Sequence, residues 1–405
     1  MLTKVTQNYR RHPESFWIIC LLALLVSFTS ISVDLVTPSL PLLTKYFDAS
    51  SGEVKLLVNA FFLGFAIAHL FWGVLSDRFG RRSILVIGLS LYCIATLACI
   101  LSNDLNILLG FRFLQGVGGA SCVILTRAVV RDIYGAERAT KAMATVILVF
   151  IPIPIITPIL GGFLIMHFSW QSLFFIMALC GLLALILVLV LLAETAPIKS
   201  VSSKLDPDQR GFLPVIKNRF FMKNTLTNMF GFGALLICIT NFPYFLYDNY
   251  NFTPQQVGWF FALFDAALGL GVIALRVVVP RFGLKRTVYT GLYLIAFGWT
   301  ALTLLYVSDI SQFMYSAIAI LMSCVGMGVV MTLTPGQAMV PFTANSGAAS
   351  SLYGILQYGG STLMVTMVNS FQGESILPAI ITAAVASYLS IICYWGFGKS
   401  ARHKV

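Results

Sequence analysis

A succession of long apolar segments constrains this chain more than any other feature of its sequence. A helix needs roughly 20 apolar residues to cross a bilayer, and about twelve such stretches follow one another along the chain. Nothing long enough to form a soluble domain remains between them. The sequence therefore predicts an all-α, polytopic membrane protein with about twelve transmembrane helices. We expect the spans at residues 16–41, 54–76, 83–102, 106–131, 140–166, 170–193, 223–247, 255–279, 287–307, 311–339, 346–370 and 375–397.

Composition excludes several other classes of protein. Only 10% of the 405 residues are charged and 58% are hydrophobic, whereas soluble domains carry roughly 25% charged residues. A net charge of +11 would suit a nucleic-acid binder, but the basic residues lie in short loops between the apolar segments. The lipid bilayer is therefore the expected partner, and nucleic acid is not. The eight cysteines show no C-x-x-C spacing, which indicates buried small apolar residues and no metal site.

The loops predict an orientation. Every second connection between spans is rich in Lys and Arg. The connections in between hold few basic residues, and acidic residues there balance their charge. Because basic loops stay on the cytoplasmic side, we expect the connections rich in Lys and Arg, together with both chain termini, in the cytoplasm. The basic connections contain Arg78, Arg81 and Arg82; Arg131, Arg138 and Lys141; Lys199, Lys204, Arg210, Lys217, Arg219 and Lys223; and Arg281, Lys285 and Arg286.

The longest connection divides the chain into six spans and six. We expect an N-terminal bundle at residues 1–193, a polar cytoplasmic linker at 194–222 and a C-terminal bundle at 223–405. This layout is typical of transporters with two parallel halves, whose substrate site lies between the halves near the middle of the membrane.

A charged decapeptide joins the second and third spans. Residues 73–82 read Gly-Val-Leu-Ser-Asp-Arg-Phe-Gly-Arg-Arg, and this run matches the G-x-L-x-D-R-x-G-R-R signature of the major facilitator superfamily. Its carboxylate can stabilise a helix N-terminus and its guanidiniums can pair with an acidic residue below span four. We interpret this cluster as a conformational latch rather than a substrate site. Its members are Gly73, Asp77, Arg78, Gly80, Arg81, Arg82 and Asp132.

Further motifs narrow the resemblance. Residues 112–120 in span four are similar to the R-x-x-Q-G-x-G element of twelve-span proton-coupled exporters. Residues 154–162 in span five resemble the antiporter G-P-x-x-G-G element, with Thr157 where glycine is usual. With residues 34–41, 131–134 and 169–171, they resemble the bicyclomycin-resistance (Bcr/CflA) group of drug exporters. The resemblance is sharpest over residues 30–175.

The resemblance implies a fold and a mode of action. It implies two six-helix bundles and proton-coupled antiport of small amphipathic compounds by alternating access, in the inner membrane of a bacterium. The proton gradient would supply the energy, with no cofactor, and a monomer is expected. Small residues would pack or kink the helices, namely Gly116, Gly119, Pro154, Pro158, Gly161 and Gly162.

Three ionisable residues inside spans are candidates for proton coupling. Asp34 ends span one and Arg112 lies in span four at a similar depth, so we expect them to face each other. Asp265, roughly 15 Å into span eight, is a second carboxyl at mid-membrane depth. Static structural pairing is the alternative for all three: Asp34 with Arg112, and Asp265 with Arg276 or with a backbone group across the bundle.

Aromatic and amide side chains are candidates for the substrate cavity, because such cavities bind flat amphipathic molecules with few fixed polar groups. The alternative for each aromatic is a lipid-facing or interfacial position. The candidates are Phe61, Gln115, Asn228, Phe232, Asn241, Phe264, Gln357 and Tyr358.

The function that we predict is proton-coupled export of small amphipathic compounds, with substrate identity left open. A dedicated exporter of one endogenous metabolite, such as a siderophore, is the nearest alternative, and a proton-coupled importer is the next. The sequence offers no nucleophile–base arrangement and no phosphate-binding loop, so neither an enzyme nor an ATP-driven pump is expected.

Overall fold

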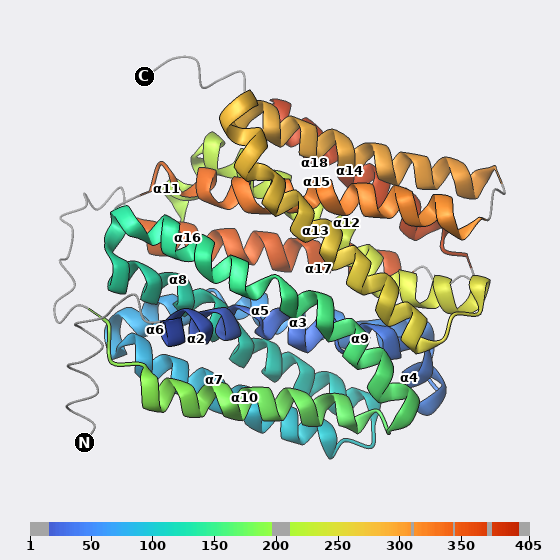
Figure 1. Ribbon diagram of the computed structural model, residues 1–405, viewed down its shortest axis with the longest axis horizontal. Helices are drawn as coiled ribbons and strands as arrows, with labels where there is room; N and C mark the ends of the chain where they lie inside the picture. Colours follow the sequence, from blue (N-terminus) through green and yellow to red (C-terminus); the bar gives the residue numbers. More distant parts are fainter. Residues whose placement is uncertain (1–15, 197–210, 309–311, 343–344, 371–374, 397–405) are drawn as a thin grey trace.

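The computed structural model describes residues 16–196, 211–308, 312–342, 345–370 and 375–396, and every regular element in them is helical (Figure 1). The elements of the N-terminal half are α2 (Phe16–Val26), α3 (Phe28–Val33), η1 (Thr37–Ser39), α4 (Leu40–Tyr46), α5 (Ser51–Ala68), α6 (Trp72–Phe79), α7 (Arg81–Ile100), α8 (Leu105–Phe150), α9 (Pro152–His167) and α10 (Gln171–Leu191). Those of the C-terminal half are α11 (Leu213–Lys217), α12 (Arg219–Tyr250), α13 (Pro254–Phe282), α14 (Leu284–Val307), α15 (Phe313–Met339), α16 (Ser346–Gly354), η3 (Ile355–Gly360), α17 (Ser361–Asn369) and α18 (Leu377–Gly396).

These helices confirm the predicted fold class of twelve spans. In the described residues, 11 helical segments are long and apolar enough to cross a membrane. The remaining predicted span, at residues 346–370, is the continuous run of α16, η3 and α17, in which η3 is a π-helical segment. Helix α8 bends at Gly135, where φ is 74°, so span four is the part of α8 before this bend, and span five is the end of α8 together with α9.

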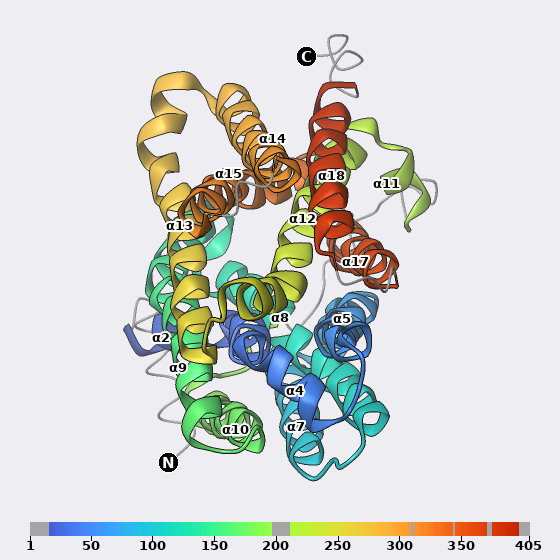
Figure 2. The ribbon, with the colours of Figure 1, turned by 90° about the vertical axis from the view of Figure 1, so that its right-hand side faces the viewer.

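Two halves pack along one interface (Figure 2). The blue-to-green helices of the N-terminal half lie below the yellow-green-to-red helices of the C-terminal half in that view. Helix α5 packs against η3 and α17, and α9 packs against α13. The predicted division of the chain at the linker 194–222 stays a prediction, because residues 197–210 lie outside the described part of the chain.

Equivalent glycines turn the chain in both halves. Gly80 separates α6 from α7 with φ 93°, and Gly283 separates α13 from α14 with φ 76°. Side chains with a Cβ rarely adopt such values, so both tight turns require glycine. These turns lie with Arg78, Arg81, Arg281 and Arg286 at one end of the molecule, which we call the basic end. The other end, with the turns from α4 to α5 and from α12 to α13, is the opposite end.

Hydroxyl groups join the two halves at the opposite end. The hydroxyls of Thr44 and Tyr244 lie 2.9 Å apart, and the Tyr244 hydroxyl donates to the carbonyl of Leu40 at 3.2 Å. Lys45 Nζ donates to the Tyr247 hydroxyl at 2.8 Å. Since α4 belongs to one half and α12 to the other, these contacts hold the halves together at this end.

The predicted packing glycines of span four have different surroundings. A Cβ on Gly116 would collide with the backbone carbonyl of Phe61 on α5, so this position needs glycine. At Gly119, a Cβ would make ordinary contacts with the Tyr92 ring, 3.5 Å away. The close approach of α5 and α8 therefore depends on Gly116 more than on Gly119.

Candidate functional site

A break in span one positions Asp34. The residue caps α3, and Pro38, four residues later, has no N–H to donate to the carbonyl of Asp34. The chain continues as the short 3₁₀ segment η1 before α4 resumes the span. This irregular backbone places a half-buried carboxyl group inside the helical bundle.

Asp265 lies across the interface from Asp34. The η1 segment packs against α13, which carries Asp265, and the two half-buried carboxyl groups are close enough for their charges to interact. Neither carboxylate forms a salt bridge in the described part of the chain, so the expected Arg276 partner of Asp265 is not seen there. The structure therefore brings together one carboxyl group from each half.

Glycines of α9 hold these carboxyl-bearing segments in place. A Cβ on Gly161 would collide with the carbonyl of Leu35, the residue after Asp34. A Cβ on its neighbour Gly162 would press on the backbone of Pro254, at the start of α13. Helix α9 thus contacts span one through one of its faces and α13 through the adjacent face. Thr157 stands where the motif usually has glycine. Its hydroxyl donates to the carbonyl of Ile153 at 2.6 Å, so the extra polar group has a hydrogen-bond partner within its own helix.

Arg112 does not form the expected ion pair with Asp34 in this structure. Its Nε donates to the carbonyl of Leu57 at 3.1 Å and its Nη1 donates to Oε1 of Gln115 at 2.6 Å. The rings of Phe61 and Phe174 lie 5.0 and 5.8 Å from the guanidinium carbon, and the whole side chain is buried. The physical reason is that helix rotation points Arg112 into its own half.

A polar network extends from Arg112 through the N-terminal half. Nε2 of Gln115 in turn donates a hydrogen bond to the hydroxyl of Thr96 at 2.8 Å. On the same helix as Thr96, the Tyr92 hydroxyl lies 2.8 Å from that of Ser32, two residues before Asp34. Nη2 of Arg112 is buried with no hydrogen-bond partner among the described residues. Gln115 is therefore part of the Arg112 network, deep inside the half.

An aromatic cluster crosses the interface between the halves. The Tyr358 ring lies 6.0 Å from that of Phe62, 4.7 Å from that of Phe65 and 5.4 Å from those of Phe232 and His69. Tyr358 belongs to the π-helical segment η3, and such segments are common at functional sites. Of the predicted cavity residues, Phe232, Gln357 and Tyr358 thus lie at the interface, with η3 packed against α5.

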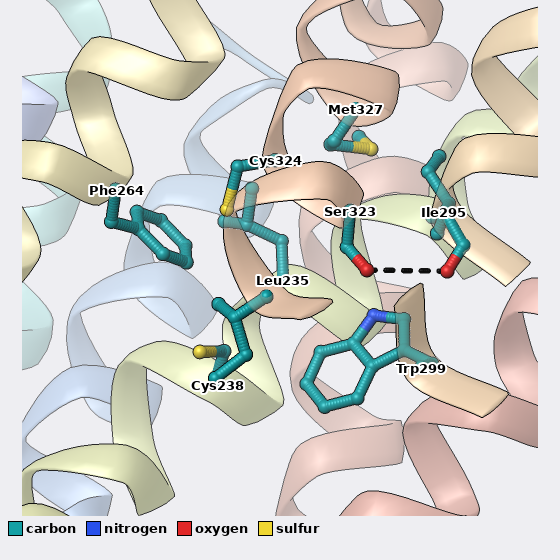
Figure 3. Close-up of a pocket in the computed structure, with 10 residues that line it drawn as sticks. Leu235, Cys238, Phe264, Ile295, Trp299, Ser323, Cys324 and Met327 are labelled. Carbon is teal, nitrogen blue, oxygen red and sulfur yellow. Dashed lines mark hydrogen bonds between the residues drawn. The ribbon is translucent and has the colours of Figure 1, made fainter. Parts of the chain in front are cut away.

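The other predicted cavity residues are placed differently. Nδ2 of Asn228 donates to the hydroxyl of Thr334 at 2.8 Å, and Nδ2 of Asn241 contacts Oδ1 of Asn369 at 3.3 Å, both within the C-terminal half. Phe61 is buried against Arg112. Phe264 lines a small cavity inside the C-terminal half, together with Cys324 and Trp299 (Figure 3). That cavity offers about 10 Å³, room for roughly one water molecule, so it cannot hold a drug.

The structure also shows residues that the sequence interpretation missed. Arg127 lies inside span four and is exposed, with His69, Tyr353 and Tyr358 as electrostatic neighbours. Its signal in the sequence was a cation within the predicted span 106–131. The Glu194 carboxylate, at the end of span six, accepts hydrogen bonds from the backbone N–H groups of Arg81 and Arg82 at 2.7 and 3.3 Å.

The model of the Major Facilitator Superfamily matches residues 21–365 of this sequence. The chain belongs to the major facilitator superfamily. It is accordingly a membrane transporter and not an enzyme.

Two relatives of known name agree with the resemblance of this major facilitator to the Bcr/CflA group of drug exporters. It is 26% identical over 388 residues to the bicyclomycin resistance protein homolog of Haemophilus influenzae, covering 95% of this chain and 97% of the relative. It is 28% identical over 386 residues to the multidrug resistance protein MdtL of Escherichia fergusonii, covering 93% and 95%.

Solved structures share the fold of this major facilitator. A crystal structure of a D-xylose–proton symporter superposes with a TM-score of 0.76 at 14% identity, covering 95% of this chain and 98% of the symporter. A bacterial homolog of the human lysosomal transporter Spinster, in an inward-facing and unoccupied conformation, superposes with a TM-score of 0.70 at 15% identity, covering 96% and 98%.

The superfamily's decapeptide forms the predicted charged cluster at the basic end. Arg81 is buried, and its guanidinium contacts Asp77 at 2.6 Å, Asp132 at 3.1 Å and the hydroxyl of Ser76 at 2.5 Å. Arg82 donates from Nη2 to the carbonyl of Leu189 at 2.8 Å. The carboxylate at the N-terminus of α7 is that of Glu194, and not that of Asp77 as expected from the sequence. The latch role of the cluster stays a prediction.

Replacing Arg81 with alanine is expected to cost about 2 kcal/mol of stability, because Asp132 and Ser76 lose a buried charged partner. We expect a lower melting temperature for the purified protein in detergent. Arg78→Ala is the matched control, because Arg78 lies in the same turn but is exposed beside the ring of Phe79. Equal melting temperatures for the two variants would contradict a structural role for the Arg81 contacts.

Proposed function

We propose that this major facilitator exports small amphipathic compounds across the inner membrane of a bacterium, in exchange for protons. The basic end and both chain termini face the cytoplasm in this proposal, although residues 1–15 and 397–405 lie outside the described part of the chain. The names of the bicyclomycin resistance and multidrug resistance relatives support the choice of cargo. The transporter works as a monomer, and the proton gradient is its only energy source.

The placement of Asp34 and Asp265 is the observation that carries the proposal. Each half contributes one carboxyl group, the two groups interact across the interface, and the described residues give neither a salt-bridge partner. Two carboxylates held close together repel each other, so binding a proton at one of them favours the closed arrangement of the halves. A bound cation or proton would therefore change the relative stability of the two transport states.

Aromatic side chains supply the binding surface for the compound. Phe62, Phe232 and Tyr358 come from both halves and pack edge-to-face or stacked. Flat amphipathic molecules bind to such surfaces through apolar contact, with little demand for fixed hydrogen bonds. Because the cluster draws on both halves, rocking of one half against the other would take it apart and release the compound.

Transport in proteoliposomes tests the proposal. The full chain is reconstituted, and ethidium and bicyclomycin are supplied outside vesicles whose lumen is acidic. We expect accumulation of substrate in the lumen through molecules whose basic end faces outward, and its collapse when a protonophore dissipates the gradient. Absence of gradient-dependent movement for every compound of a drug panel would overturn the proposal.

A further inference from the structure

The short helix α11 carries apolar side chains that the protein does not cover. Phe212, Leu213 and Ile216 are 41%, 62% and 46% exposed, whereas Val215 is fully buried. Leu213 and Ile216 are three residues apart in a helix, so they share one face, and Val215 lies on another. One face of α11 is therefore packed on the protein, and another presents an apolar surface to the outside.

Contacts on both sides hold α11 to the C-terminal half. Val215 packs in an apolar cluster with Phe221 of α12 and with residues of α15 and α16. Nδ2 of Asn345, just before α16, donates to the carbonyl of Gly211 at 3.0 Å. After α11, the side chain of Asn218 accepts a hydrogen bond from the N–H of Phe221 at 3.0 Å and caps α12. The apolar face thus belongs to an element with a defined place in the molecule.

The position of α11 puts this face beside the bilayer. Figure 1 shows α11 at the basic end, and Figure 2, a view along the spans, shows it outside α18 at the edge of the C-terminal half. Only Asn218 separates α11 from α12, whose 32 residues span about 48 Å. A bilayer with its headgroups is about 40–45 Å thick, so α12 begins at the level of the headgroups. Helix α11 therefore lies beside the bundle at that level.

Exposed tryptophans mark the same level of the membrane. Trp17 is the second residue of α2, and Trp395 lies in the last turn of α18, both at the basic end. Their side chains are 66% and 60% exposed, and tryptophan accumulates at the interface between membrane and water. Because α11 lies outside α18 at this end, its Phe212 extends the same interfacial belt.

The charges around α11 indicate which lipids it meets. Lys217 follows Leu213 by about one helical turn, so it lies beside the exposed apolar face, and Arg219 follows at the start of α12. Both basic side chains are exposed, and no acidic residue occurs between Asp208 and Asp248 in the sequence. Apolar side chains flanked by cations bind to membrane surfaces that contain anionic lipids.

We propose that α11 is a docking element for anionic phospholipids of the leaflet at the basic end. Phe212, Leu213 and Ile216 insert between the headgroups and the first carbons of the acyl chains. The ammonium group of Lys217 binds lipid phosphate groups, while its alkyl stem covers apolar surface. This site lies outside the spans, and it is separate from the interface at which the transported compound binds.

Hydrogen–deuterium exchange in lipid nanodiscs tests this proposal. A single helical turn is unstable by itself, so the exchange of its amides depends on how firmly neighbouring surfaces hold it. The full-length protein is placed in nanodiscs of phosphatidylglycerol or of phosphatidylcholine with the same acyl chains. Exchange of the peptide 211–218 is followed by mass spectrometry. We expect exchange at least about fivefold slower in the anionic lipid.

Two variants separate the charged from the apolar contribution. Lys217→Gln combined with Arg219→Gln is expected to reduce the difference between the two lipids to less than about twofold. Ile216→Gln is expected to speed exchange of the same peptide in both lipids, by about threefold, because less apolar surface is buried in the membrane.

Lys285→Gln combined with Arg286→Gln is the matched control. It removes two exposed cations from the basic end of α14, which lies across α18 from α11 in Figure 2. It is expected to leave the difference between the lipids unchanged. Equal exchange in the two lipids would overturn the proposal and would show that another part of the chain, or a second copy, covers this face. A difference that survives Lys217→Gln with Arg219→Gln would overturn it as well.

Discussion

Asp34→Asn is expected to abolish substrate movement driven by a pH gradient. Asparagine keeps the size and polarity of the side chain but has no proton to exchange, so the cycle loses its coupling step. Exchange of labelled for unlabelled substrate without a gradient is expected to persist, because it needs only binding and alternation. Both rates are measured in the same proteoliposomes.

Asp248→Asn is the matched control for this experiment. Asp248 is an exposed carboxyl group near the end of α12, and its removal is expected to leave gradient-driven transport unchanged. If Asp34→Asn still accumulates substrate against a gradient, the carboxyl group is not the coupling site. If it abolishes exchange as well, Asp34 is required for alternation or binding rather than for coupling.

Gly161→Ala is expected to cause a large loss of both stability and transport. The added methyl group would collide with the backbone carbonyl of Leu35, which cannot move aside as a flexible side chain can. Extra atoms in such a well-packed contact cost about 1–3 kcal/mol. We expect a lower melting temperature and a strongly reduced rate of transport, because the segment that carries Asp34 is displaced from α9.

Gly110→Ala is the control for Gly161→Ala. Gly110 lies in α8, and a Cβ there would meet no atom within 4 Å. Its replacement is expected to leave transport unchanged and stability equal or slightly higher, since alanine favours helix more than glycine does. Wild-type transport by Gly161→Ala would show that the close approach of α9 to span one is not needed for function.

Much of the architecture could be predicted because the bilayer restricts what an apolar segment can do. Apolar length predicted the spans, and the decapeptide at 73–82 predicted the superfamily. The depth expected for Asp265 came from counting residues along a helix at about 1.5 Å each. These predictions depend on position along the chain, which the sequence states directly.

The rotation of each helix about its own axis could not be predicted from the sequence. Arg112 was expected to face Asp34, yet its side chain donates to Leu57 and Gln115 within its own half. The π-helical turn at Tyr358 depends likewise on packing between distant segments. Such contacts arise from tertiary structure and leave no periodic pattern in either span.

The hydroxyl contacts at the opposite end have a consequence for the surroundings in which the transporter works. Thr44 and Tyr244 hold the halves together there through a contact between two neutral hydroxyls, whereas the hydrogen bond from Lys45 to Tyr247 has a charged donor. Dissolved salt screens charges but hardly affects hydrogen bonds between neutral groups. High ionic strength is therefore expected to weaken the contact made by Lys45 and to leave the Thr44–Tyr244 contact in place, so part of this closure is independent of salt.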